Sequence, residues 1–317
     1  MKTLLRALSG ATAVLAMTFV LGAASPAQAA DGSVTLIYNG AVRGELEDCG
    51  CPKRPLGGLA RRAHLIEEIK ADRSDAILLD AGSLFGDPTR PTLARSRFLA
   101  AETAKLGYDV IGIGPYELGH GVEAIRQIAA SSGLHFVSSN VERGGDLLFE
   151  PYRIIERGGM KVAVTSVFDP DFIGKDYMVD AGDIEVTDPV KAMRTWLPEM
   201  DAASDVVVVL MNLSQSNNVP FLRQLNESGH DQIDVLVDGI WDNPISKPRR
   251  FGSARMISAN SRGKYVGEAT ITVSEGKVSD LDNEIHFLDL KLPEDPAIAV
   301  RVKDYLESSE VVHATND

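Results

Sequence analysis

Short apolar runs alternate with amphipathic stretches after residue 30, and this pattern predicts repeated β–α units. The run 205–212 is too apolar for a strand with one face in water, so it predicts a sheet covered on both faces. Asp188 followed by Pro189 predicts a helix start, because Asp is a favoured N-cap and Pro suits the first helical position. Strands are predicted at 34–39, 76–82, 109–114, 134–139, 161–168, 205–212, 234–239 and 254–259, and helices at 58–71, 96–107, 122–132 and 189–200.

The last part of the chain changes character. Residues 264–290 alternate apolar and polar positions around Glu275-Gly276, which predicts a β-hairpin, and a final helix is expected after Pro293. The segment 247–250 (KPRR) is interpreted as a solvated basic turn. We find no internal repeat and no Pro/Gly/Ser-rich linker, so residues 30–317 are expected to form a single α/β domain.

The first 29 residues have the features of an export signal. Lys2 and Arg6 precede an uncharged stretch that runs to residue 30, and Ala27-Gln28-Ala29 is a small-x-small cleavage site. We therefore expect a cleaved Sec-type signal peptide at 1–29, a periplasmic product and no stable membrane anchor. An uncleaved anchor is the alternative, because the uncharged stretch is just long enough to span a bilayer.

The charge balance narrows the choice of partner. The chain has 45 acidic and 32 basic residues, and without Lys2 and Arg6 the basic count is 30, an acidic excess of 15. Such a surface repels polyanions, so we expect no nucleic-acid partner. The contents of 44% hydrophobic and 24% charged residues are those of an ordinary globular protein.

Six short segments, in chain order, carry a resemblance to one known family. They are YNGAVRGEL (38–46), LDAGSLFG (79–86), LGYD (106–109) with GPYELGHG (114–121), MNLS (211–214), DGIWD (238–242) and GKYVG (263–267). They resemble the motifs of the 5′-nucleotidase branch of the calcineurin-like metallophosphoesterases, over about residues 33 to 290. The resemblance implies a four-layer α/β/β/α sandwich of the metallo-dependent phosphatase type, with two mixed central sheets. The C-terminal substrate domain of full-length 5′-nucleotidases is expected to be absent.

The departures from this family fall on its metal ligands. A two-metal centre needs inward-facing oxygen and nitrogen donors from several strand ends. The arginine at 43 places a positive charge where a cation is expected, so the sequence predicts a degenerate metal site and no cofactor. At the ligand positions that the resemblance implies, this chain has Ala41, Arg43, Ser83, Pro115, Tyr116, Asn212, Ile240 and Asp242.

The two cysteines form the segment Cys49-Gly50-Cys51, on the loop that leaves the first predicted strand. In an oxidising compartment such a pair is expected to be disulfide-linked or redox-active. The segment ahead of GGLARRA is similar to that of the UDP-sugar-hydrolase-like (seleno)protein subgroup, in which some members carry selenocysteine, and this similarity implies a redox role. Arg43, Arg61 and Arg62 are the expected supporting cations for a thiolate.

Three functions remain open at this point. The main prediction is an exported thiol-redox protein that uses Cys49 and Cys51 with a periplasmic thiol/disulfide or electron-transfer partner. The first alternative is a divalent-metal-dependent phosphohydrolase of the 5′-nucleotidase type. The second alternative is a soft-metal protein in which Cys49, Cys51 and His120 bind Cu or Zn. Tyr116 and Trp241 are further candidates for lining the pocket at the altered metal site.

Overall fold

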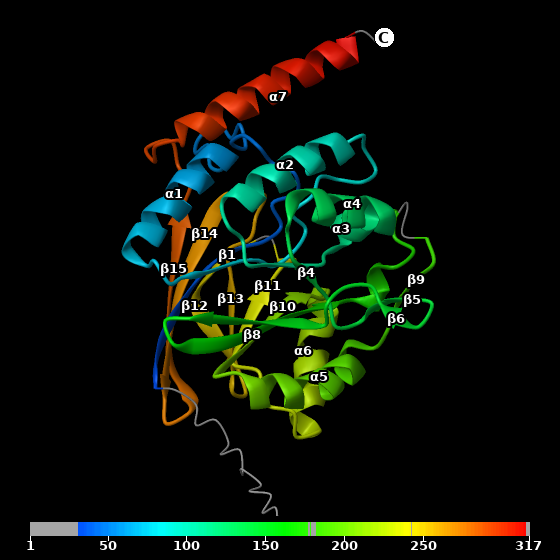
Figure 1. Ribbon diagram of the computed structural model, residues 1–317, viewed down its shortest axis with the longest axis vertical. Coiled ribbons are helices and arrows are strands. Elements are labelled where there is room, and N and C mark those ends of the chain that lie inside the picture. Colours follow the sequence, from blue (N-terminus) through cyan, green and yellow to red (C-terminus); the bar gives the residue numbers. More distant parts are fainter. Residues whose placement is uncertain (1–30, 177, 179–181, 242, 315–317) are drawn as a thin grey trace, which may run out of the picture.

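The computed structural model describes residues 31–176, 178, 182–241 and 243–314, and it stacks two β-sheets between two layers of helices (Figure 1). The predicted signal peptide at 1–29 and Asp242 lie outside the described residues. Within those residues, no helix has the length and apolarity needed to cross a membrane. The side chains of residues 309–314 are not described.

The first sheet has six strands in the order β15-β14-β1-β2-β3-β4. Strands β1 to β4 run parallel, and β14 and β15 add an antiparallel hairpin beside β1, so the sheet is mixed. The hairpin turns at Glu275 and Gly276, as predicted. The strands are β1 (Gly32–Asn39), β2 (Ile77–Asp80), β3 (Val110–Gly112), β4 (Phe136–Val137), β14 (Tyr265–Ser274) and β15 (Lys277–Phe287).

The second sheet also has six strands, in the order β12-β13-β11-β10-β8-β7. Its four central strands are parallel, whereas β7 and β12 are antiparallel edge strands. A small third sheet has the order β6-β5-β9. The strands are β5 (Val141–Arg143), β6 (Asp146–Leu147), β7 (Tyr152–Arg157), β8 (Met160–Phe168), β9 (Ile184–Val186), β10 (Val206–Asn212), β11 (Val235–Asp238), β12 (Ile245–Phe251) and β13 (Ala254–Ser258).

The helices cover the outer face of each sheet (Figure 1). Asp188 caps α5 by accepting hydrogen bonds from the backbone N–H groups of Val190 (2.8 Å) and Lys191 (3.3 Å), as its position before Pro189 predicts. A short 3-10 turn follows β8 at Pro170–Phe172. The first sheet is covered by α1 (Leu59–Asp72), α2 (Leu93–Lys105), α3 (Pro115–Gly119), α4 (Val122–Ser132) and α7 (Pro296–Ala314), and the second by α5 (Pro189–Ala203) and α6 (Gln215–Glu227).

Strand β10 shows why the sequence forms stacked layers. Val206, Val208 and Leu210 pack in the core between the two sheets. Val207 and Val209 point to the opposite face, into the core beneath α5 and α6. Because successive side chains of a strand alternate between faces, an unbroken apolar run requires burial on both. The predicted four-layer sandwich with two mixed sheets is confirmed.

Candidate functional site

The carboxyl ends of strands from both sheets meet at one edge of the sandwich. Gly40, directly after β1, forms a parallel bridge with Asn260, two residues after β13. Asn212, the last residue of β10, donates a hydrogen bond from Nδ2 to the carbonyl oxygen of Ala81, directly after β2 (2.6 Å). Loops at the carboxyl ends of parallel strands commonly form binding sites, and we call this place the strand-end edge.

The backbone at the strand-end edge is strained. Ala41, Arg43 and Ser83 have φ angles of 48°, 56° and 56°, in the left-handed region that side chains with a Cβ disfavour. Backbone hydrogen bonds hold them there: the N–H of Ala41 donates to Gly82 and that of Arg43 to Ser83, both at 2.8 Å. Such strain tends to collect at functional sites. These three residues occupy positions where the resemblance places metal ligands.

A fourth strained residue joins the same edge from the second sheet. Arg262 has φ 49°, and its backbone N–H donates to the carbonyl oxygen of Ala41 (2.8 Å). The loop after β13 is thereby attached to the loop after β1. Arg43 and Arg262 therefore approach the strand-end edge from different sheets.

These two arginines line a hollow of about 340 Å³, which we call the strand-end hollow. The Arg43 guanidinium lies 5.8 Å from the centre of the Tyr116 ring, within cation–π range. Arg262 Nε donates to Glu45 Oε1 (2.8 Å). The lining of the strand-end hollow has four cationic and two anionic side chains, so the hollow favours an anion. It consists of Arg43, Glu45, Gly86, Asp87, Arg90, Thr92, Arg95, Tyr116 and Arg262.

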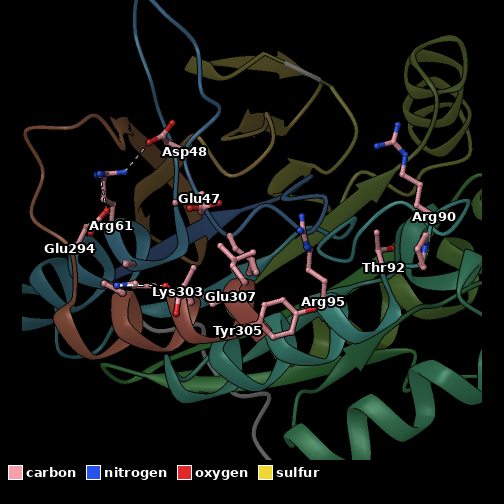
Figure 2. A pocket seen from close by; sticks show the side chains of 17 residues that line it. Glu47, Asp48, Arg61, Arg90, Thr92, Arg95, Glu294, Lys303, Tyr305 and Glu307 are labelled. Carbon is pink, nitrogen blue, oxygen red and sulfur yellow. Dashed lines mark ion pairs between the residues drawn. The ribbon is translucent and has the colours of Figure 1, made fainter. Parts of the chain in front are cut away.

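A larger hollow of about 720 Å³, the α7 groove, lies between α1, α2, α7 and the loop after β1 (Figure 2). It shares Arg90, Thr92 and Arg95 with the strand-end hollow, so the two are neighbours. In Figure 2, Arg90 and Thr92 stand on one side of Arg95, and Tyr305 and Glu307 on the other. Its lining is Leu46, Glu47, Asp48, Gly58, Ala60, Arg61, Arg90, Pro91, Thr92, Arg95, Glu294, Ala299, Val302, Lys303, Tyr305, Leu306 and Glu307.

Three buried carboxylates near the strand ends bind backbone N–H groups instead of facing a hollow. Glu117 Oε2 accepts from the N–H groups of Ser83 and Gly114 (both 2.8 Å), and Oε1 from that of Phe85 (3.0 Å). Burial raises the pKa of Glu117 above its ordinary value, and these hydrogen bonds oppose the shift. This acid is therefore a structural clamp on the loop after β2.

Asp80 and Asp238 behave in the same way. Asp80 Oδ1 accepts from the N–H of Gly82 (2.8 Å), and burial raises the pKa of Asp80 to about 8. Asp238 Oδ1 accepts from the N–H groups of Ile240 (2.7 Å) and Trp241 (3.0 Å), and burial raises its pKa to about 6. Both carboxylates shape turns at strand ends.

The strand-end edge does not fit a two-metal centre in the part of the chain that the structure describes. At the altered ligand positions, Ala41, Arg43, Pro115, Tyr116 and Ile240 supply poor ligands for divalent ions, and Ser83 and Asn212 supply only uncharged oxygens. Asn212 Oδ1 is buried and has no hydrogen-bond partner, but a Cβ at Gly239 would lie only 2.8 Å from it and one at Gly114 only 3.0 Å. The backbones of these two glycines therefore approach this oxygen closely. Asp242 lies outside the described residues.

One other group of described residues has the spacing of metal ligands. Glu268, Glu284 and His286 lie together on β14 and β15. His286 Nε2 already contacts Glu268 (3.1 Å), and Arg73 Nε lies 3.6 Å from the same carboxylate. The Glu268 carboxylate is thus already contacted by His286 and Arg73, and the group is a side-chain cluster on the β14–β15 hairpin.

The residues of the predicted soft-metal site contact protein atoms in the structure, and soft-metal binding stays an untested prediction. Cys49 and Cys51 are joined in a disulfide, whereas Cu or Zn binds the thiolate form. His120 Nε2 contacts the carbonyl oxygen of Gly86 (2.9 Å) and Ser96 Oγ (3.3 Å). This histidine packs against the loop after β2.

The predicted supporting arginines have different positions. Arg61 binds Glu294 (2.8 Å) and lies 3.9 Å from Asp48, so it belongs to the α7 groove. Arg62 is buried in the core, with only 1% of its surface exposed. Arg43 and Tyr116 do line the strand-end hollow, whereas Trp241 packs on the other side of the second sheet, against Arg249.

Sequence reasoning missed three of the four arginines of the strand-end hollow: Arg90, Arg95 and Arg262. Arg90 and Arg95 follow the LDAGSLFG segment, and Arg262 directly precedes the GKYVG segment. Their nearness to the motif segments was the available signal. Arginines in a loop or on a helix surface are common, so that nearness did not distinguish them from solvated surface charges.

Comparisons with known proteins agree on one class. No family model matches the chain. A 5′-nucleotidase of Vibrio parahaemolyticus is 23% identical over 268 residues, which are 74% of this chain and 48% of that protein. The chain thus spans about half the length of the curated relatives it matches.

Solved structures show the same fold. A sulfate thiohydrolase, SoxB, of Thermus thermophilus aligns with TM-score 0.78 and 17% identity, over 87% of this chain and 61% of that one. A 5′-nucleotidase precursor, also of Thermus thermophilus, aligns with TM-score 0.73 and 20% identity, over 88% and 59%. The calcineurin-like phosphoesterase YfkN of Bacillus subtilis aligns with TM-score 0.71 and 16% identity, over 90% and 99%. The relatives and structural neighbours are thus 5′-nucleotidases and calcineurin-like metallophosphoesterases.

These findings overturn two predictions. The thiol-redox function is wrong, because the relatives are 5′-nucleotidases, and the phosphohydrolase alternative fits them better. The expectation of no cofactor is also wrong, because this class depends on divalent metals and a metal-binding group is therefore plausible. The described residues nevertheless do not form the two-metal cage at the strand-end edge. This disagreement distinguishes the chain from the class it resembles.

Proposed function

We propose that the chain takes phosphate monoesters of the kind that 5′-nucleotidases act on, and that the phosphate group binds in the strand-end hollow. The observation that carries this proposal is the convergence of four arginines, Arg43, Arg90, Arg95 and Arg262, on one hollow at the carboxyl ends of the strands. Guanidinium groups match the geometry of phosphate oxygens and remain charged at every physiological pH.

The side chains of the strand-end hollow have different roles in binding the phosphate. Arg95 has no ion-pair or hydrogen-bond partner within the described residues, so its guanidinium is available to a ligand. Tyr116 supports Arg43 through its ring, and Glu45 orients Arg262 by accepting from Nε. A guanidinium held in place before the ligand arrives loses less entropy on binding. The strained backbone of Arg43 and Arg262 serves the same preorganisation.

Hydrolysis of the bound ester is the second candidate function, and the likeness to 5′-nucleotidases favours it. The arginines would stabilise the charge that builds up on the phosphoryl oxygens. Glu45 is paired with Arg262, so Asp87 is the carboxylate of the hollow that could take a proton from water. A hydrogen bond from the Thr89 hydroxyl contributes most to lowering the pKa of Asp87, so this group is ionised at neutral pH. Because the metal ligands do not fit, no step of this account passes through a metal.

We also propose that the protein is exported to the periplasm. It depends on residues 1–29, in which a basic start, an uncharged stretch and a small-x-small site precede the first strand. Residues 30–317 would then act as one domain carrying the strand-end hollow.

Calorimetric binding of adenosine 5′-monophosphate tests the proposal. Arg43→Ala and Arg262→Ala are each expected to weaken binding roughly 10-fold or more, since each removes a charged hydrogen-bond donor to the phosphate. Arg97→Ala is the matched control, because Arg97 lies on α2 near Arg95 but is exposed and binds Gln127 (3.1 Å). Equal affinities for the wild type and all three variants would rule out the strand-end hollow as the phosphate site.

A further inference from the structure

We infer that the α7 groove holds the organic group of the bound ester, and that this group has an apolar ring face and a hydrogen-bond donor at its far end. The inference rests on the proposed function, because it extends the ligand outward from the phosphate site. It assigns a role to α7 and to Glu47, which do not line the strand-end hollow.

The two hollows adjoin where they share residues. Arg90, Thr92 and Arg95 line both, so a ligand that extends past these side chains from the strand-end hollow would reach the α7 groove. Arg95 stands between the two halves in Figure 2. A phosphate bound near Arg43 and Arg95 would therefore direct its ester oxygen towards α7.

Apolar side chains form part of the groove lining. Leu46, Ala60 and Val302 are buried beneath it, and Tyr305 and Leu306 lie along α7. Tyr305 stacks on Phe98 of α2, with ring centroids 4.4 Å apart and planes 16° from parallel. An aromatic side chain held rigidly by a neighbour gives a ring ligand a surface to contact without further loss of side-chain entropy.

Most charges around the groove are already paired. Arg61 binds Glu294 at 2.8 Å, and Lys303 lies 3.7 Å from Glu307 (Figure 2). Two charges have no hydrogen-bond or ion-pair partner among the described residues: the Arg95 guanidinium and the Glu47 carboxylate.

The two unpaired charges are of opposite sign, so they attract different parts of a ligand. Arg95 faces the phosphate side, and the exposed Glu47 lies on the loop after β1. A carboxylate accepts hydrogen bonds from amino or hydroxyl groups and repels a second phosphate. The site therefore suits an ester with one anionic end, an apolar ring in the middle and a donor group at the other end.

Titrations with three ligands distinguish a failure of this inference from a failure of the proposed function. Calorimetric titrations of the full chain use inorganic phosphate, ribose 5-phosphate and adenosine 5′-monophosphate, which add a sugar and then an amino-bearing ring to the same anion. We expect the ring-bearing ester to bind roughly 10-fold more tightly than ribose 5-phosphate, because only it reaches Tyr305 and Glu47. If inorganic phosphate itself does not bind, the proposed function fails. If phosphate binds but the two esters have equal affinities, the groove inference alone fails.

Two variants test the groove residues directly. Glu47→Gln is an exposed substitution, and it is expected to weaken the ring-bearing ester roughly 3-fold to 10-fold without changing phosphate binding. Tyr305→Ala should abolish the preference for the ring-bearing ester. Val300→Ala is the control on α7, because Val300 is 58% exposed and does not line the groove. Unchanged ligand preference in both Glu47→Gln and Tyr305→Ala would overturn the inference.

Discussion

The carboxylate of Glu117 accepts a hydrogen bond from the backbone N–H of Ser83 at 2.8 Å, and through it α3 is attached to the loop after β2. Ser83 occupies a metal-ligand position of the resemblance and has a left-handed φ of 56°. Glu117, the acidic residue of the GPYELGHG segment, therefore maintains the shape of the loop after β2 rather than binding an ion. The same loop carries Gly86 and Asp87 of the strand-end hollow.

Glu117→Gln is expected to destabilise the fold by about 1–3 kcal/mol. The glutamine amide has one acceptor oxygen, and its NH₂ group would face a buried backbone N–H that now binds a carboxylate. Urea denaturation measures the change. Glu156→Gln, on an exposed position of edge strand β7, is the control. A loss no larger than that of the control, within about 0.5 kcal/mol, would contradict the clamp.

Asp80 predicts a pH dependence of stability. Burial raises its pKa from 3.8 to about 8, so between these values the folded protein holds a proton at Asp80 that the unfolded chain has released. The free energy of unfolding should therefore fall as pH rises through this window, by up to about 1.4 kcal/mol per pH unit from this group. Asp80→Asn removes the titration and keeps the shape.

The readout is the difference in unfolding free energy between the wild type and Asp80→Asn, measured at several pH values. This difference should shift in favour of the variant as pH rises. A constant difference across the window would show that the carboxyl does not titrate there.

The ion pair between Glu102 on α2 and Arg301 on α7 is expected to hold the wall of the α7 groove. Arg301 Nη2 lies 2.8 Å from Glu102 Oε2, and the Glu102 side chain is only 3% exposed. Arg301→Ala should accelerate amide hydrogen exchange in α7 roughly 10-fold or more, since a charged hydrogen bond to a buried group is lost. Lys303→Ala, whose partner Glu307 is exposed, should have little effect.

Lowering the pH should weaken the ion pair between Glu102 and Arg301. Burial alone would raise the pKa of Glu102, but hydrogen bonds from Arg301 and Lys105 outweigh it and lower the pKa below its ordinary value of 4.5. The stabilisation is present at neutral pH and is lost as pH falls through the lowered pKa. Protection of α7 that persists unchanged in acid would contradict this assignment.

The disulfide between Cys49 and Cys51 is expected to be dispensable. It closes a very short loop, so its contribution to the unfolding free energy should be about 2 kcal/mol or less. The double variant Cys49→Ser, Cys51→Ser should also bind inorganic phosphate within about twofold of the wild type, because neither sulfur lines the strand-end hollow. Loss of phosphate binding in a double variant that still folds would show that the two sulfur atoms contribute to the phosphate site.

The layered fold could be predicted because its signals are local. The apolar run of β10 and the cap at Asp188 specify burial on two faces and a helix start, and both are observed. Helix α6 was missed because Pro220 lies inside it, although Asn218, Phe221, Leu222 and Leu225 have helical spacing on its buried face. The basic turn predicted at 247–250 is wrong: these residues belong to edge strand β12, where charges and Pro248 are tolerated.

The site could be predicted only in part. The motif segments indicated the correct strand ends, and they include Arg43 and Tyr116, which line the hollow. Their chemistry was misassigned to the nearby cysteines, because a sulfur pair is a stronger sequence signal than dispersed arginines. Arg95, on α2, and Arg262, on the loop after β13, come together only in the fold, where a backbone contact between Arg262 and Ala41 attaches that loop to the loop after β1; sequence spacing does not encode such contacts.

The arginines of the strand-end hollow are expected to hold the phosphate group without help from another ligand. Calorimetric titration of the full chain with inorganic phosphate in the presence of a strong chelator measures this. Saturable binding is expected under these conditions, as is loss of that binding in the double variant Arg43→Ala, Arg262→Ala. Absence of binding in chelator, with saturable binding restored by added Mn²⁺ or Zn²⁺, would contradict it.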